Sequence, residues 1–265
     1  MITGNDSPSI PSQRLNEWQS KALRSLGSNA EFVREKCHGF LVLRQHSPMA
    51  LAALEELLPD PDRLFHEASI LKPGSRTHAG VVEIAGVKFV LKRYNCRGWF
   101  YRLGNALRRS RALRAWLVNW DYLVRGLPVP VPLLCLEERR WRLLERSYVL
   151  MEFVEEALTL RERWAGLAEK EKFEFVESCG EMMGRMHRTG MLHGDLKWDN
   201  ILVGGIPSRD TARLVDLDGS VALKRFSFRR ARKDYDRFLK DLRKHEGDDA
   251  LLDHAVRAWK RGLAR

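Results

Sequence analysis

Residues 193–200 read HGDLKWDN, and this stretch decides how the rest of the chain is interpreted. It places a carboxylate (Asp195), an amine (Lys197) and an amide (Asn200) close together, after a run, residues 171–191, whose apolar side chains recur at helical spacing. The apolar triplet ILV follows it directly. We therefore expect a polar loop that is held between two packed elements and presents these three groups together.

The loop has the groups that phosphoryl transfer from ATP requires. That reaction needs cations and metal ions to hold the phosphates, and a carboxylate to orient the acceptor hydroxyl. Asp195 can accept the proton of an acceptor hydroxyl, Lys197 can neutralise charge on the transferred phosphoryl group, and Asn200 can ligate Mg²⁺. We expect these roles of base, charge-stabilising cation and metal ligand.

Two further segments supply matching groups. Downstream, RLVDLDGS ends an apolar strand-like run at Asp216, and a hairpin between Asn200 and Asp216 would bring both to one metal ion. Asp218 is a second acid on that turn, and it either binds metal or caps the turn at Gly219. Far upstream, VKFVLKRY presents Lys92 on a predicted strand, where it can pair with the α- and β-phosphates.

With these spacings the chain resembles the protein-kinase-like superfamily, whose motifs are a strand lysine, H-R-D-x-x-x-x-N and D-F-G. FVLK, HGDLKWDN and VDLD stand at the matching places over roughly residues 68–220. The resemblance implies an α+β, bilobal protein-kinase-like fold with a small antiparallel-sheet N-lobe and a reduced, mainly helical C-lobe. It also implies ATP and Mg²⁺ as cofactors.

The resemblance further implies where ATP binds. YVLMEFV is similar to the fifth strand and hinge of kinases, so backbone from Glu152 to Val154 is expected at the adenine edge. The phosphate-covering loop PGSRTHAG lacks the usual G-x-G-x-x-G, so its polar side chains would contact phosphate instead. The nucleotide-binding candidates are Lys92, Ser75, Arg76, Thr77, Glu152 and Val154.

Three departures from the protein-kinase pattern bear on regulation, on the class of acceptor and on the partner of Lys92. Gly194 replaces the arginine that reads a phosphorylated activation loop, so switching by loop phosphorylation is not expected. No A-P-E follows Asp216, and the segment after it is short for a peptide-binding lobe, so we expect an acceptor that is small or presented from a surface. Ala115 stands where a helix glutamate would pair with Lys92, which leaves that lysine to be oriented by another residue or by the nucleotide.

Finer details resemble the lipopolysaccharide-core kinase family, which includes heptose kinases and Kdo kinases. They are VLKRYN, RALRAW followed by GLPVPVPL, MHRTGMLHGDLKWDNILV, and KDYDRFLKDL. The resemblance covers about residues 68–245. It implies an acceptor sugar, which we expect to be heptose, in the inner core of lipopolysaccharide on the cytoplasmic side of the inner membrane.

The charge pattern agrees with an anionic acceptor. The formal net charge is +11, residues 86–120 hold nine basic side chains and no acid, and residues 224–244 hold ten basic side chains against three acids. Such blocks attract phosphates, carboxylates and anionic lipid, although solvated helix faces are the simpler interpretation. We expect peripheral contact with the anionic inner-membrane surface. Nucleic-acid binding has no support beyond the charge and is not expected.

The remaining composition indicates a cytoplasmic globular chain. The start, MITGNDSPSIPSQ, has neither the basic nor the apolar region of a signal peptide, and no apolar run is long enough to span a bilayer. The four cysteines are far apart, and we expect them to be reduced.

Two other functions stay open at this point. A small-molecule kinase of the aminoglycoside or choline type shares the HGD form, but its acidic pocket for cationic acceptors conflicts with the net charge of +11. A non-catalytic nucleotide-binding scaffold conflicts with an intact set of motif residues. Within the loop, Trp198 either stacks on a sugar or packs the loop onto its lobe, and His193 is expected to bind backbone of the Asp216 turn rather than to carry a proton.

The patterns divide the chain into three parts. Residues 1–65 are expected to form a partly helical N-terminal extension, residues 66–154 a kinase-like N-lobe, and residues 155–265 a kinase-like C-lobe with the loop. In the N-lobe we predict a three-stranded antiparallel meander from Ala68, with a tight Ala85-Gly86 turn, and a later hairpin. A helix is predicted to begin at Ser47-Pro48.

Overall fold

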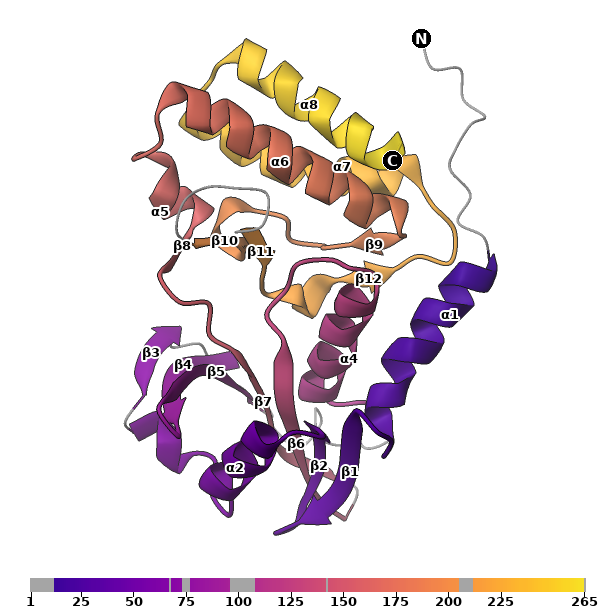
Figure 1. Cartoon of the computed structure of the whole chain (residues 1–265), viewed down its shortest axis with the longest axis vertical. Coiled ribbons are helices and arrows are strands. Elements are labelled where there is room, and N and C mark those ends of the chain that lie inside the picture. The colour runs from indigo at the N-terminus through magenta and orange to yellow at the C-terminus, as the bar shows by residue number, and fades with distance from the viewer. Residues whose placement is uncertain are drawn as a thin grey trace. The chain divides into compact units, whose positions relative to one another are not determined.

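The chain forms two compact units (Figure 1). The computed structural model describes residues 12–66, 68–72, 77–95, 108–141, 143–204 and 212–264. We call one unit, formed by Gln19–Val124 and Pro130–Phe153, the sheet unit. The other, formed by Met1–Trp18, Arg125–Val129 and Val154–Arg265, is called the helical unit.

An antiparallel sheet organises the sheet unit. Its seven described strands follow the order β1-β2-β6-β7-β5-β4-β3. The strands are β1 (Phe32–Cys37), β2 (Phe40–Gln45), β3 (Ser69–Lys72), β4 (Thr77–Ile84), β5 (Val87–Tyr94), β6 (Pro132–Arg140) and β7 (Leu143–Glu152). The predicted meander is confirmed as β3-β4-β5 and the predicted hairpin as β6-β7.

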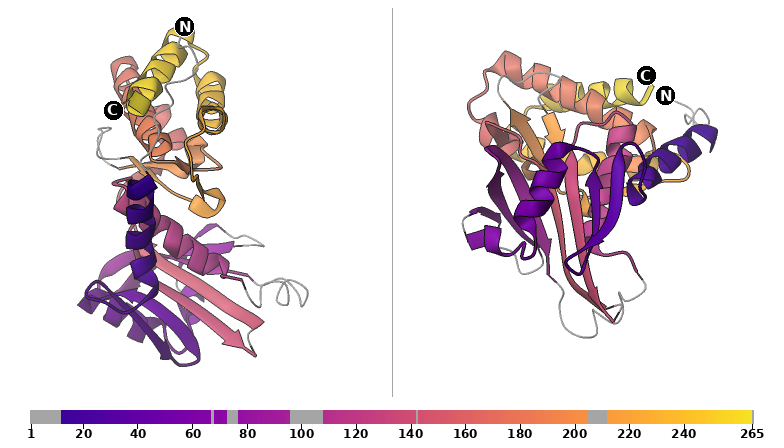
Figure 2. Two further views of the ribbon diagram at one scale, coloured as in Figure 1. Left: turned by 90° about the vertical axis from the view of Figure 1, so that its right-hand side faces the viewer. Right: turned by 60° about the horizontal axis from the view of Figure 1, so that its bottom comes forward.

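Helices pack on both faces of this sheet (Figure 2). Successive side chains of a strand point to opposite faces. Leu134 and Leu136 of β6 accordingly join the apolar cluster under α2 (Pro48–Leu57), whereas Cys135 joins the cluster under α4 (Arg111–Val124). The Ser47 side chain caps α2 by accepting the Ala50 N–H, which confirms the predicted helix start.

The first two strands of the sheet were not predicted. Residues 32–45, assigned above to a partly helical extension, pair as β1 and β2, and β2 pairs with β6. The turn between them consists of His38 and Gly39, both with positive φ (47° and 83°). That is the conformation of a two-residue hairpin turn, and Ala85-Gly86 adopts it between β4 and β5. Before β1 the chain forms α1 (Ser12–Leu23). Two short 3₁₀ turns, η1 (Arg24–Leu26) and η2 (Arg63–His66), lie in the same part of the chain.

The helical unit consists of helices and two small sheets. Its helices are α5 (Leu160–Trp164), α6 (Glu169–Arg188), α7 (Phe228–His245) and α8 (Asp249–Ala264), with 3₁₀ turns η3 (Trp198–Asn200) and η4 (Leu217–Gly219). One sheet consists of β8 (Ala157–Thr159), β10 (Ile201–Gly204) and β11 (Ala212–Leu214). The other consists of β9 (Met191–Leu192) and β12 (Val221–Ala222).

The helices α6 and α8 lie side by side (Figures 1 and 2). A Cβ at Gly184 would lie only 2.7 Å from Cα of Gly262, so glycines permit this close packing. Within the described parts of the chain, none of the helices combines the length and apolar character needed to cross a lipid bilayer.

Candidate active site

Two small sheets bring the Asp216 turn back to the HGDLKWDN loop. β9 ends directly before the loop and β10 begins directly after it. β11 pairs with β10 and β12 pairs with β9, so residues 215–220, which connect β11 to β12, lie beside both ends of the loop. The Val215 N–H donates to the carbonyl oxygen of Asn200 at 3.0 Å. The predicted hairpin between Asn200 and Asp216 is therefore confirmed.

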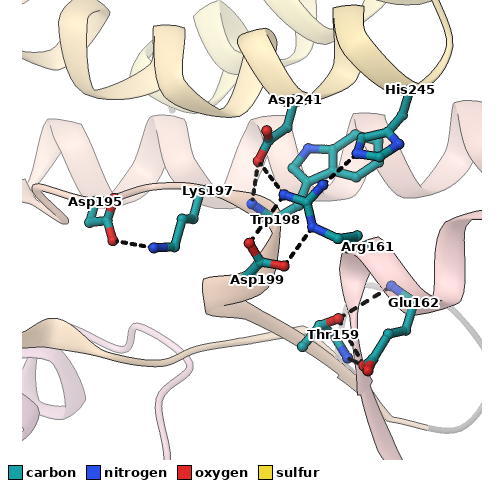
Figure 3. A network of polar contacts seen from close by, with 9 residues as sticks. All are labelled: Thr159, Arg161, Glu162, Asp195, Lys197, Trp198, Asp199, Asp241 and His245. Carbon is teal, nitrogen blue, oxygen red and sulfur yellow. Dashed lines mark hydrogen bonds and ion pairs between the residues drawn. The ribbon is translucent and has the colours of Figure 1, made fainter. Parts of the chain in front are cut away.

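Asp195, Lys197 and Asn200 contact one another within the loop. Lys197 Nζ lies 2.9 Å from Asp195 Oδ2 (Figure 3), and the Asn200 side-chain amide donates to the same oxygen at 3.0 Å. The Asn200 amide also donates to the backbone oxygen of Asp195 at 2.8 Å. Asn200 is buried, whereas the Asp195 side chain is 48% exposed. The loop thus holds one accessible carboxylate between an amine and a buried amide.

These contacts fix the protonation of the pair. Burial raises the pKa of Asp195, but the hydrogen bonds from Lys197 and Asn200 outweigh it, so this pKa lies below its usual value. The hydrogen bond to Asp195 raises the pKa of Lys197. At neutral pH the carboxylate is ionised and the amine is protonated, which leaves Asp195 able to accept a proton.

The Asp216 turn meets the loop through two glycines. Asp216 adopts a left-handed conformation (φ 61°) at the start of η4, and Asp218 on η4 is exposed. Gly194 also has a positive φ, 83°, and a Cβ at this position would lie 2.7 Å from the carbonyl carbon of Gly219. Since a side chain at 194 would be both strained and obstructed, the approach of the turn to the loop requires glycine there.

His193 connects the two segments through its ring. One ring nitrogen, Nε2, lies 3.1 Å from the carbonyl oxygen of Val215, and the other, Nδ1, accepts the N–H of Asp195. Nε2 therefore carries the proton and donates it to Val215. Burial lowers the pKa of His193, which keeps the ring neutral. The prediction that His193 binds backbone of the Asp216 turn is confirmed.

Asp234 of α7 anchors the start of the loop, and sequence analysis missed it. Its carboxylate accepts the backbone N–H of His193 at 2.7 Å and that of Gly194 at 2.9 Å. The Asp234 side chain is 3% exposed, and burial raises its pKa, but hydrogen bonds from His187 and the loop backbone outweigh burial and lower it. A usable signal was an acid on the same helical face as Tyr235 and Phe238, inside a basic segment.

Three helices meet at this anchor. The indole N–H of Trp259 in α8 donates to Nδ1 of His187 in α6 at 2.8 Å, so the Nε2 proton of His187 faces Asp234 at 3.2 Å. Tyr235 of α7 stacks on the Trp259 ring, with centroids 5.0 Å apart. The position of the loop therefore depends on the packing of α6, α7 and α8 together.

Trp198 packs the loop against the helices. Its side chain is 0% exposed and lies between Trp164, at a centroid distance of 4.6 Å, and His245, at 5.0 Å. A ring in this position has no face left for a ligand. Of the two roles considered above for Trp198, the structure shows packing of the loop onto its unit and excludes stacking on a sugar.

The nucleotide-binding candidates lie mostly in the sheet unit. Lys92 is in β5, opposite Ala79 of β4 and Val149 of β7, and Thr77 is the first residue of β4. Glu152 ends β7 and Val154 follows it in the helical unit. The remaining two candidates, Ser75 and Arg76, lie outside the described residues.

Two features near these candidates bear on nucleotide contacts. The Glu152 N–H donates to Val131 O at 2.9 Å and its carboxylate accepts the Val131 N–H at 3.0 Å, so the backbone donor at 152 is already used. Ala115 of α4 is buried in the apolar cluster with Cys135 and Val149, and it gives Lys92 no charged partner.

The anchoring role of Asp234 predicts a loss of stability when its carboxylate is removed. We expect Asp234→Ala to lower the free energy of unfolding by about 2–4 kcal/mol, because it leaves buried backbone N–H groups and the His187 ring without their acceptor. Asp236→Ala, an exposed position on the same helix paired with Arg232, is the matched control and should cost less than about 1 kcal/mol. Urea unfolding of both variants measures the difference, and equal losses would contradict the anchor.

The sequence is similar to those of proteins that are named as sugar kinases. Proteins from four strains of Xylella fastidiosa are named 3-deoxy-D-manno-octulosonic acid kinase, and two of them illustrate the similarity. That of strain 9a5c is 29% identical over 213 residues, which cover 74% of this chain and 82% of the relative. That of strain M23 is 31% identical over 140 residues, which cover 50% of this chain and 54% of the relative.

A solved structure shows the fold of the chain, and a family profile shows its family. The structure titled "WaaP in complex with acyl carrier protein" matches 78% of this chain and 86% of its own, with a TM-score of 0.56 and 17% identity, so the two share a protein-kinase-like fold. The profile described as "Lipopolysaccharide kinase (Kdo/WaaP) family" matches residues 75–258. The chain therefore belongs to the lipopolysaccharide kinase (Kdo/WaaP) family, whose members are ATP-dependent phosphotransferases that act on sugar hydroxyls.

Proposed function

We propose that the chain transfers the γ-phosphoryl group of ATP to a hydroxyl of 3-deoxy-D-manno-octulosonic acid (Kdo) in the inner core of lipopolysaccharide. The observation that carries the proposal is the contact of Asp195 with Lys197 and Asn200 at an accessible position of the loop. The names of the relatives favour Kdo over heptose. Kdo also carries a carboxylate, which suits a chain of net charge +11.

Asp195 is the proposed general base. It orients the sugar hydroxyl and accepts its proton as the oxygen attacks phosphorus. Lys197 holds Asp195 in place and faces the negative charge of the transferred phosphoryl group. Asn200 fixes the Asp195 backbone through its amide nitrogen, so its amide oxygen points away from these contacts.

Asn200, Asp216 and Asp218 are the proposed Mg²⁺ ligands. Their donors are amide and carboxylate oxygens, which fit Mg²⁺, and this ion is commonly held by one or two carboxylates together with substrate phosphates. Among the described residues there is no cluster of three or more His, Cys, Asp or Glu side chains that could hold a metal by itself. When bound, Mg²⁺ would neutralise charge on the phosphates.

The sheet unit is proposed to bind the nucleotide. Lys92 on β5 would pair with the α- and β-phosphates, and Thr77 at the start of β4, with Ser75 and Arg76 before it, would contact phosphate. Backbone near Glu152 and Val154 would meet the adenine edge. Because the Glu152 N–H is used by Val131, a backbone N–H that donates to adenine would come from the residues after it.

The exposed basic face of α7 supports contact with an anionic membrane surface. The basic side chains exposed on α7 and just before it are Lys224, Arg225, Arg229, Arg230, Lys233, Lys240, Arg243 and Lys244. Each basic side chain near an anionic surface contributes about 1 kcal/mol of attraction. We therefore propose peripheral binding at the inner-membrane surface where the acceptor lies.

The acceptor is tested directly with ATP and core glycans that end in unphosphorylated Kdo or in heptose, each in anionic and in neutral vesicles. We expect transfer to Kdo, faster on anionic vesicles, and a loss of about 10²–10⁴-fold in kcat for Asp195→Asn, which lacks the base. Asp236→Asn, exposed on α7, is the control and should transfer at the wild-type rate. Transfer to heptose alone or to cationic amino-sugars would overturn the acceptor, and full activity of Asp195→Asn would overturn the base.

A pH profile tests the coupling of Asp195 to Lys197. The base works only when ionised, so the rate falls as pH drops through its pKa, and in the wild type this limb lies below the usual range of aspartate, about pH 4. Lys197→Ala removes the hydrogen bond and the charge that lower the pKa of Asp195, so its acid limb should move to higher pH. Measuring kcat/KM from about pH 3 to pH 8 for both proteins checks this, because the range then includes values below the usual pKa of aspartate. Coincident acid limbs would show that Lys197 does not set the pKa of the base.

A further inference from the structure

We propose that α7 sets the geometry of the loop at two points, and that Asp241, held by Arg161, is the positioning residue at the second point. The first point is Asp234, which binds the backbone at the start of the loop. The inference rests on the proposed function, because it takes Asp195 and Asn200 as the groups whose positions matter.

The spacing of the two acids on α7 matches the length of the loop. Asp234 and Asp241 are seven residues apart, which is close to two turns of helix, so both face the same side about 10 Å apart. Asp241 Oδ2 accepts the backbone N–H of Trp198 at 2.9 Å. Residues 195–197 therefore lie between two backbone positions that are each bound to a carboxylate of one rigid helix.

Arg161 of α5 holds Asp241, which we call the second anchor of the loop (Figure 3). Its guanidinium donates to both carboxylate oxygens of Asp199, at 2.6 and 3.1 Å, and contacts Asp241 Oδ2 at 3.4 Å. One guanidinium thus balances two carboxylates, one on the loop and one on α7. The hydrogen bond with Asp199 raises the pKa of Arg161 and lowers that of Asp199, so both remain charged.

Local structure explains why Arg161 reaches this place. β8 pairs with β10, the strand that begins directly after Asn200, and Thr159 lies opposite Leu202. Thr159 also caps α5, because its hydroxyl accepts the Glu162 N–H while the Glu162 carboxylate accepts the Thr159 N–H (Figure 3). The cap starts the helix beside the loop, and Arg161 in its first turn faces Asp199.

A ring contact completes the anchor. The imidazole of His245, the last residue of α7, stacks on the buried Trp198 indole with an interplanar angle of 17°. Arg161 Nη1 lies 2.6 Å from His245 Nε2, and since arginine only donates, this nitrogen is the acceptor. The same guanidinium therefore fixes Asp199, Asp241 and the ring that covers Trp198.

A displacement of the Trp198 backbone would also displace Asn200 and Asp195, the groups proposed to bind metal and to act as base. Asn200 lies two residues after Trp198, its N–H donates to Lys197 O at 3.0 Å, and its side chain holds Asp195. Freeing the Trp198 backbone would loosen Asn200 and, through it, Asp195. Misplacement of reacting groups by about 1 Å can cost about 10²-fold in rate, so the second anchor should be visible in kcat.

Two substitutions at Asp241 separate positioning from general stability. Asp241→Ala removes the acceptor for the Trp198 N–H, and we expect kcat for transfer to Kdo-terminated glycan to fall about 10²-fold with little change in KM for the glycan. Hydrogen–deuterium exchange of the peptide covering residues 196–201 should become faster in the same variant. Asp241→Asn keeps an oxygen acceptor, so it should retain kcat within about threefold and restore slow exchange. Asp236→Ala, on the exposed side of α7, is the control.

The measured kcat and exchange rates either support the inference or overturn it. Wild-type kcat and exchange in Asp241→Ala would overturn the inference, and so would equal losses in the Ala and Asn variants, because the Trp198 acceptor would then not be the cause. If Asp241→Ala does not fold, Arg161→Ala, at a partly exposed position, replaces it, with faster exchange at residues 196–201 and lower kcat expected; wild-type values there would overturn the inference. The exchange measurement needs no activity, so it remains decisive even if Asp195→Asn refutes the proposed function.

Discussion

The buried carboxylate of Asp234 is the contact on which the helical unit depends. A charged group in this position is costly unless it is hydrogen-bonded, and here two backbone N–H groups of the loop and the His187 ring donate to it. Trp259 orients that ring from α8. One carboxylate therefore joins three helices to the start of the loop, and the site cannot keep its shape unless the helices are packed.

Asp234 fixes the start of the loop, and strand pairing and two glycines place the Asp216 turn beside it. The pairing of β11 with β10 and of β12 with β9 leaves the Asp216 turn no position except beside the loop. There Gly194 and Gly219 approach so closely that a Cβ on Gly194 would collide with backbone. The glycine of the HGD motif is thus required by the packing of the turn. It also removes the arginine through which protein kinases respond to a phosphorylated loop.

Sequence reasoning reached the parts of the site that lie in contiguous motifs. Asp195, Lys197 and Asn200 are close in the chain, and the apolar runs around Asp216 predicted the hairpin that brings it to Asn200. It missed Asp234, His187, Arg161 and Asp241, because each acts on the loop from a different helix and spacing along the chain does not show which helices meet. It also missed β1 and β2, whose turn residues, His38 and Gly39, form a two-residue turn without the usual Asn-Gly pair.

The central proposal is that the HGDLKWDN loop transfers phosphate to a sugar of the lipopolysaccharide inner core. Mass spectrometry of core oligosaccharide tests it most directly, with cells that carry the wild-type protein, the Asp195→Asn variant or neither. We predict one additional phosphate on Kdo with the wild-type protein, and its absence in the other two. Identical core phosphorylation in all three would contradict the claim.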